Sequence, residues 1–99
     1  MRKTPRIEWS EGARANLLDI VDYISNDNLR AAQLLKDEIE AKVNALPDHP
    51  KKFAKSRRAI GYRQLTVSSN YLVFYRLISE KVPQIIDVAA VVHARRKWP

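Results

Sequence analysis

The sequence predicts an α+β fold in the order β-α-α-β-β-β, in which a helical hairpin packs on one face of a twisted antiparallel sheet. Three observations lead to this prediction. Two segments in the first half of the chain repeat apolar residues at three- and four-residue steps, as amphipathic helices do. The second half contains three β-rich segments separated by short turns. A short segment before the helices alternates polar and apolar residues and supplies a fourth strand.

The first strand is expected over residues 6–9, where the alternation lies. Ser10 follows and is expected to cap the first helix, because its hydroxyl can accept a hydrogen bond from a free amide of the first turn. The apolar stripe of this helix consists of Ala13, Leu17, Leu18, Ile20, Val21 and Ile24. The polar run 25–28 is expected to end this helix and to cap the next one.

The second helix completes the predicted hairpin. Its apolar stripe consists of Ala31, Leu35, Ile39, Val43 and Leu46. Pro47 and Pro50 end the helix, because proline lacks the N–H group that a helix interior needs. Residues 51–60 then form a basic connector without an apolar period of its own.

The remaining strands are expected over residues 62–67, 71–77 and 84–92. Ser68-Ser69-Asn70 reads as a hairpin turn, with Asn70 at a position that tolerates positive φ. The segment 84–92 is the most apolar stretch, which predicts a central strand covered on both faces. With the helices on one face of the sheet, the other face is predicted to be the working surface.

Composition narrows the class of protein. A chain of 99 residues with 45% hydrophobic residues predicts a single domain, residues 1–99, around one small core. The absence of cysteine excludes disulfides and thiolate metal sites, and fits a reducing compartment. No apolar segment approaches the length of a membrane span. We therefore expect a cytoplasmic protein with no cofactor, no metal and no membrane partner.

Charge is divided unevenly between the two halves of the chain. Residues 1–48 contain seven Lys and Arg against nine Asp and Glu, a balance of −2, whereas residues 49–99 contain eleven against two, a balance of +9. A field of this sign attracts polyanions, either nucleic acid or a strongly acidic protein. The alternative is a basic surface that is merely solvated.

The candidate site is a set of cations interleaved with aromatic residues. Arginine grips phosphates or carboxylates in bidentate fashion, and aromatic rings stack on bases or on guanidinium planes. The residues predicted to bind a polyanion or another target are Arg57, Arg58, Arg63, Arg76, Arg95, Arg96, Lys97 and Trp98. Tyr71 and Tyr75 lie on one strand face among these cations, so they also suit a place in the core with their hydroxyls at its edge.

Two further residues leave alternatives open. His93 is the only histidine within this cationic set, and it could move protons near neutral pH or simply end the last strand with a backbone hydrogen bond. Asp87 interrupts an apolar strand, which indicates a sheet edge or, as we prefer, a pair with an arginine such as Arg76. The sequence contains no metal-ligand cluster, glycine-rich phosphate loop or Ser-His-Asp spacing.

Several segments spread over nearly the whole chain carry a resemblance to a known family. They are Trp9 to Ala13, Leu17 to Ile24 with Asp27 and Ala31-Ala32, Gly61 to Leu65, Tyr71 to Arg76, and His93 to Pro99. Their order and spacing resemble the ParE/RelE superfamily of toxins from type II toxin–antitoxin systems, which includes plasmid stabilisation proteins. The resemblance implies the RelE/ParE-like fold and a growth-inhibiting toxin that a cognate antitoxin protein neutralises in a hetero-oligomer.

Within this superfamily two activities compete. RelE-like members are ribosome-dependent mRNA endoribonucleases, or mRNA interferases, and on that pattern the catalytic residues would be Arg63, Arg76, His93 and Arg95. Leu65 and Leu72, however, stand where that branch has further cations. If the chain is an enzyme, the resemblance implies an endoribonuclease that acts on mRNA, with the ribosome as its partner.

ParE-like members instead inhibit DNA gyrase by binding it. The segments Gly61-Tyr62-Arg63 and Val73-Phe74-Tyr75-Arg76, with the strand that leads to His93, resemble this branch. We therefore favour a ParE-like inhibitor of DNA gyrase, with the ribosome-dependent ribonuclease as the alternative. A third hypothesis is a basic nucleic-acid-binding module without toxin activity, which ranks last because the sequence contains no standard nucleic-acid-binding motif.

Overall fold

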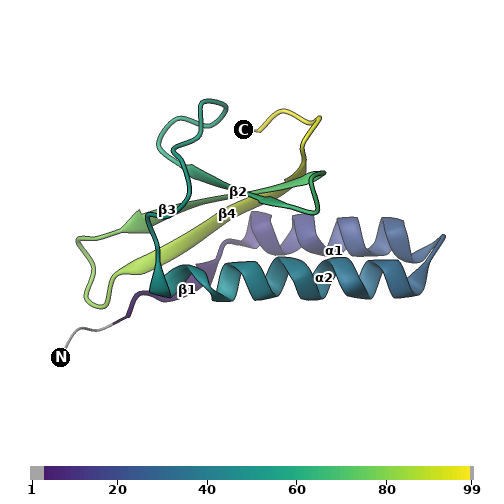
Figure 1. The fold of residues 1–99 in the computed structure, drawn as a ribbon, viewed down its shortest axis with the longest axis horizontal. Helices are drawn as coiled ribbons and strands as arrows, with labels where there is room; N and C mark the ends of the chain where they lie inside the picture. The colour runs from purple at the N-terminus through teal and green to yellow at the C-terminus, as the bar shows by residue number, and fades with distance from the viewer. Residues whose placement is uncertain (1–3, 99) are drawn as a thin grey trace.

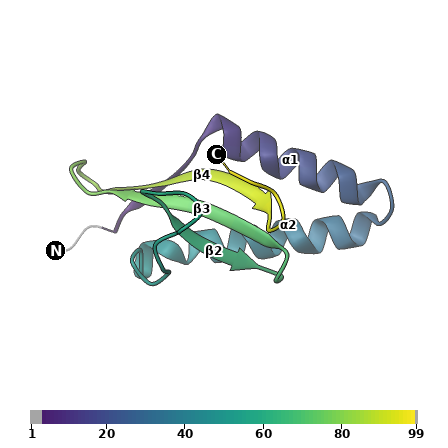
Figure 2. The same cartoon turned by 90° about the horizontal axis from the view of Figure 1, so that it is seen from above.

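The computed structural model describes residues 4–98 and has the predicted order of elements. The elements are β1 (Arg6–Trp9), α1 (Glu11–Ser25), α2 (Leu29–Asn44), the 3-10 helix η1 (Leu46–Asp48), β2 (Arg63–Val67), β3 (Tyr71–Ile78) and β4 (Ile85–His93). Figure 1 shows the two helices running along one face of the sheet. Figure 2, seen from above, shows them as an antiparallel pair behind strands β2 to β4. The predicted helical hairpin on one face of a sheet is therefore confirmed.

The sheet is mixed rather than wholly antiparallel. Its strand order is β1-β4-β3-β2, and β2, β3 and β4 pair antiparallel as predicted. β1 instead pairs parallel to β4, with Arg6 opposite Ile85 and Trp9 opposite Val88. Parallel neighbours need a long crossover, which here contains both helices and two strands. The direction of β1 thus depends on which edge it joins, and local sequence does not specify that edge.

The ends of the helices follow the predicted capping residues. The Ser10 hydroxyl oxygen accepts a hydrogen bond of 3.0 Å from the backbone N–H of Ala13. The side-chain oxygen of Asn28 accepts one of 2.9 Å from the N–H of Ala31. At the β2–β3 turn, Ser68 and Ser69 take the positive φ values, 50° and 64°, in place of the expected Asn70. Positive φ at two consecutive turn residues matches the right-handed twist of the two strands.

The main core lies between the helical hairpin and the sheet. Its helix side includes Ala13, Leu17, Leu35, Ile39 and Val43, and its sheet side includes Leu65, Val67, Val73, Tyr75, Val88 and Val91. The predicted stripes are confirmed with two exceptions. In α2, Ala32 is fully buried in place of the predicted Ala31, which is half-buried. Leu18 is 66% exposed, because its neighbour Leu17 occupies the buried position and the next residue points about 100° away around the helix.

A second, smaller core covers the opposite face of the sheet. It consists of Ala59, Leu72, Phe74, Ala90 and Val92, with Tyr62, Ala94 and Trp98 packed against it. Figure 1 shows that the connector before β2 and the segment after β4 both lie on this side. The prediction that β4 is covered on both faces is confirmed. The face opposite the helices, which we predicted to be the working surface, is partly covered by this second core. In the part of the chain that the structure describes, no helix is long and apolar enough to cross a membrane.

Candidate functional site

A group of exposed cations lies where the connector before β2 meets the segment after β4. We call this group the basic lobe, and it consists of Arg57, Arg58, Arg95, Arg96 and Lys97. Arg58 joins the two segments, because its guanidinium donates hydrogen bonds to the backbone oxygens of Ala94, at 2.6 Å, and Arg96. The structure therefore brings together cations that lie more than 30 residues apart in the sequence.

An aromatic cluster anchors the C-terminal end of the basic lobe. The ring of Trp98 stacks on Phe74, with centroids 5.1 Å apart and an interplanar angle of 17°, and meets Tyr62 edge-on at 5.1 Å. The Arg76 guanidinium lies 5.5 Å from the Tyr62 ring centre, and its Nε donates to the Asp87 carboxylate at 3.1 Å. The expected pair of Asp87 and Arg76 is confirmed. Trp98 and Arg76, both candidate target-binding residues, thus have partners inside the fold.

Arg63 holds the start of the connector on the sheet. Its guanidinium donates to the backbone oxygens of Phe53, at 2.7 Å, and Lys51, at 3.4 Å. The hydroxyl of Tyr75, which lies opposite Arg63 in the ladder, donates to the backbone oxygen of Pro50 at 3.0 Å. Burial raises the pKa of the Tyr75 hydroxyl, and the nearby Arg63 charge opposes this shift. Tyr75 is fully buried, which confirms its place in the core.

His93 lies at the end of β4, opposite Tyr71. Its Nδ1 accepts a hydrogen bond of 3.2 Å from the backbone N–H of Arg95, and its ring meets Tyr71 edge-on at 5.3 Å. Acceptance at Nδ1 places the proton of the neutral ring on Nε2. The strand-ending role considered for His93 is therefore present in the structure.

The four candidate ribonuclease residues lie in different places. Arg63 is opposite Tyr75 and His93 is opposite Tyr71, four residues away on β3, which corresponds to roughly 13 Å along the strand. Arg76 packs with Tyr62 on the face that carries the second core. Arg95 is exposed beyond the end of β4. His93 and Arg95 are close neighbours at the end of β4. Arg63 and Arg76 lie one ladder position apart, so their side chains project from opposite faces of the sheet.

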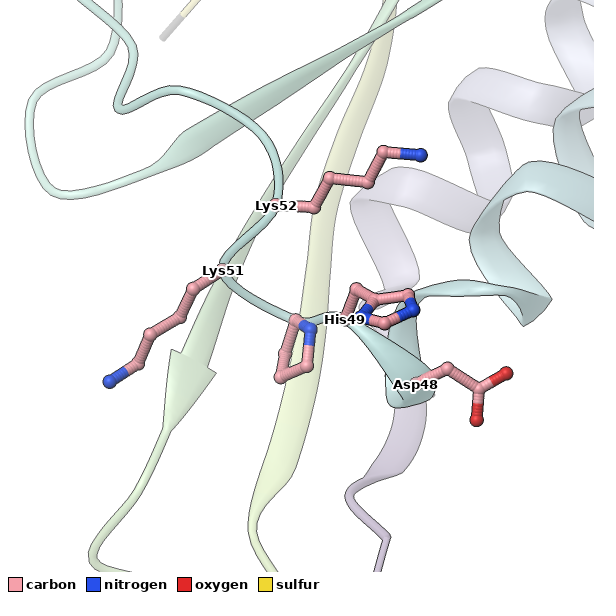
Figure 3. Close-up of a pocket in the computed structure, with 5 residues that line it drawn as sticks. Asp48, His49, Lys51 and Lys52 are labelled. Atoms are coloured by element: carbon pink, nitrogen blue, oxygen red, sulfur yellow. The ribbon is translucent and has the colours of Figure 1, made fainter.

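Two hollows lie near these residues. One, of about 550 Å³, runs between α1 and the ends of β3 and β4, and it is lined by Asn16, Asp19, Ile20, Tyr23, Tyr71, Val91, Val92, His93 and Arg96. Asn16, Asp19 and Tyr23 were not predicted as site residues, because in the sequence they look like ordinary residues of the polar helix face. The other, of about 530 Å³, lies at the turn 48–52. Figure 3 shows Lys51 and Lys52 pointing away from each other at this turn.

The structure also bears on metal binding. Among residues 4–98, no three His, Cys, Asp or Glu side chains come together in a way that could hold a metal ion. The charges that do gather are cationic, in the basic lobe. Its chemistry is therefore suited to the recognition of anions.

Comparisons with known proteins agree with this fold. The family model described as "ParE toxin of type II toxin-antitoxin system, parDE" matches residues 7–98. The chain is also similar to Y4kP of Sinorhizobium fredii, a protein named as a toxin. The two are 28% identical over 95 residues, which cover 95% of this chain and 93% of Y4kP.

Two solved structures share the fold. A chain of the chromosomal ParDE system from P. aeruginosa matches with a TM-score of 0.77 and 17% identity, over 91% of this chain and 96% of that one. A YoeB/ParE toxin from Agrobacterium tumefaciens matches with a TM-score of 0.58 and 12% identity, over 89% of this chain and 96% of that one. At these identities the structures support the architecture, and the family model carries the assignment. The chain belongs to the ParE toxin family of type II toxin–antitoxin systems.

Proposed function

We propose that this toxin inhibits DNA gyrase by binding it and that a cognate antitoxin neutralises the toxin. One structural observation carries the choice of a binding inhibitor over a ribonuclease. The ribonuclease pattern would need the guanidinium groups of Arg63 and Arg76 at one scissile phosphate. Instead, Arg63 binds backbone oxygens and Arg76 binds Asp87, on opposite faces of the sheet. A nuclease needs its proton-transfer group and its phosphate-binding cations within reach of the same phosphate.

The direct test is a supercoiling assay with purified gyrase, relaxed plasmid and ATP. We expect the toxin to reduce the supercoiled product in proportion to its concentration, and equimolar antitoxin from the neighbouring reading frame to restore it. In cells, expression without antitoxin is expected to cause filamentation and to induce the DNA-damage response. Normal supercoiling at a large excess of toxin would remove the proposal.

One feature favours the alternative of a ribosome-dependent endoribonuclease. His93 has Nε2 free for proton transfer, and it adjoins the exposed Arg95. Primer extension on cellular transcripts after induction separates the two activities. Cuts at defined codon positions that disappear in a His93→Ala variant would establish the ribonuclease and contradict the gyrase proposal. Intact transcripts in growth-arrested cells would support the gyrase proposal.

The antitoxin is expected to use two features of the toxin. The helical hairpin exposes the apolar side chains Leu18, Tyr23, Leu29 and Leu34, and the second half of the chain has an excess of cations. We propose that an acidic segment folds on binding, with apolar side chains against the helices and carboxylates toward the cations. Stopped-flow association should then slow as salt is raised, because rim charges act mainly on the association rate. An association rate that does not change with salt would contradict the proposed role of the cations in antitoxin binding.

A further inference from the structure

We propose that the basic lobe binds the phosphate backbone of duplex DNA directly. This inference goes beyond the proposed function, because it needs no gyrase.

The cations of the basic lobe have few acidic residues near them to neutralise their charge. The chain after residue 48 has only two acidic residues, Glu80 and Asp87, and Asp87 is paired with Arg76. Glu80 lies in the β3–β4 turn beyond Ile78, and Ile78 is seven ladder positions, roughly 23 Å, from the end where Tyr71 meets His93.

A carboxylate of the helical half lies near the basic lobe. Asp19 of α1 shares the hollow near the end of β4 with Arg96. The two side chains form no ion pair within 4.0 Å in the structure of residues 4–98. Arg57, Arg95 and Lys97 do not line this hollow, and all three are exposed. Among residues 4–98, Arg57, Arg95 and Lys97 of the basic lobe therefore form no ion pair.

Five contacts hold the segment after β4, which carries Arg95, Arg96 and Lys97, in place. The N–H of Ala94 donates to the Asn70 oxygen at 2.7 Å, and the N–H of Arg96 donates to the His93 oxygen at 2.9 Å. Arg58 grips the carbonyls of Ala94 and Arg96, and Trp98 stacks on Phe74. A backbone ordered before binding loses less conformational entropy when a ligand arrives. Arg58 is thus a positioning residue for the exposed cations of the tail.

The surroundings of the basic lobe favour a nucleic acid over an acidic protein. Protein interfaces have an apolar centre depleted of charge, whereas DNA-binding surfaces are polar and strongly positive. Four of the large exposed apolar side chains, Leu18, Tyr23, Leu29 and Leu34, lie on the helical hairpin. In the segments 54–62 and 94–98, Ile60 alone is a large exposed apolar residue. The basic lobe therefore lacks the centre on which a protein partner would pack.

The aromatic residues favour a duplex over a single strand. Proteins that bind single strands offer free rings on which bases stack. Here Trp98 stacks on Phe74 and meets Tyr62 edge-on, and Tyr71 packs against His93. Each of these rings is engaged with another ring of the fold, which favours a grip on the sugar-phosphate backbone over base stacking. Such a grip suits duplex DNA without sequence preference.

The test measures binding of the full-length toxin, without gyrase or antitoxin, to a fluorescein-labelled 20-base-pair duplex across a salt series. We expect a dissociation constant of roughly 10⁻⁶ to 10⁻⁴ M near physiological salt, independent of sequence. The variant Arg95→Gln/Lys97→Gln should weaken binding about tenfold or more at low salt and should reduce the slope of log K against log salt by about two.

The matched control is Arg14→Gln/Arg30→Gln, which removes the same charge from exposed positions on α1 and α2. Equal weakening by both double variants would mean that net charge alone attracts DNA, and it would overturn the proposal. Tighter binding of a single-stranded RNA of equal charge, or equal competition by polyglutamate, would assign the basic lobe to another polyanion. Thermal midpoints of all variants confirm that the fold is intact. Because supercoiling is assayed separately, a toxin that does not bind DNA would leave the gyrase proposal standing. A toxin that does not inhibit supercoiling would likewise leave the DNA-binding proposal standing.

Discussion

The side-chain oxygen of Asn16 on α1 accepts a hydrogen bond of 3.0 Å from the backbone N–H of Val91 on β4. β1 pairs with β4 only as far as Val88, so α1 has to satisfy the rest of this strand edge. The Ser10 hydroxyl, besides capping α1, donates to the Ala89 carbonyl at 3.0 Å. Helix side chains thus protect a strand edge that could otherwise pair with another chain.

Replacing Asn16 should expose the dependence of β4 on this contact. An Asn16→Leu variant leaves the buried N–H of Val91 without a partner, which costs about 1–3 kcal/mol. Urea unfolding should show this loss, and the Val91 amide should exchange faster with solvent. The control is Asn44→Leu, at an exposed α2 position, where a change within about 0.5 kcal/mol is expected. Equal stability of the two variants would contradict the assigned role.

Removal of the Arg58 guanidinium should release the C-terminal segment. An Arg58→Met variant loses both hydrogen bonds to the Ala94 and Arg96 carbonyls, so Trp98 should leave Phe74 more often. In a Trp9→Phe background, Trp98 emission should shift to the red and proteolysis after Arg95 or Arg96 should become faster. Arg57→Met removes the same charge and should change neither property. Unchanged emission in the Arg58 variant would show that aromatic stacking alone holds the segment.

The buried Tyr75 hydroxyl gives a prediction for stability at high pH. Burial raises the pKa of Tyr75, so its neutral form contributes stability that is present below the unfolded-state pKa of about 10. That stability should be lost as the pH rises through the folded-state pKa. Tyr75→Phe removes the hydrogen bond to the Pro50 oxygen, which should lower the free energy of unfolding by about 1 kcal/mol at neutral pH. The variant should also lose less stability than the original protein as the pH rises. The exposed Tyr23→Phe is the control, and urea unfolding at several pH values is the measurement.

Glu38 provides a prediction at low pH. The Ser68 hydroxyl donates to its carboxylate at 2.8 Å and, with Lys42, lowers the pKa of Glu38. A lowered folded-state pKa contributes stability above the unfolded-state pKa of about 4.3, and this is lost as pH falls through the folded-state value. Ser68→Ala should therefore raise the Glu38 pKa in an NMR titration of the side-chain carbonyl carbons. Ser69→Ala, also at positive φ, should leave it unchanged.

The sequence alone determined the order of elements and the main core. Ser10 and Asn28 cap their helices through amides three residues away, so both contacts are local. The helix stripes follow a repeat of 3.6 residues, which is also local information, and they correctly identified residues such as Leu17 and Ile39. The pair of Arg76 and Asp87 was foreseeable as well, because an isolated acid in an apolar strand needs a cation.

Only the tertiary structure decided the direction of β1, the second core and the shape of the basic lobe. Arg58 and Arg63 look alike in the sequence, yet one binds the C-terminal segment and the other binds the connector. Trp98 reads as a free aromatic residue until Phe74 is brought beneath it. Each of these contacts joins segments without a local repeat, so it arises only when the sheet sets their relative positions. Local periodicity specifies which faces are apolar, whereas the packing of those faces specifies which polar groups meet.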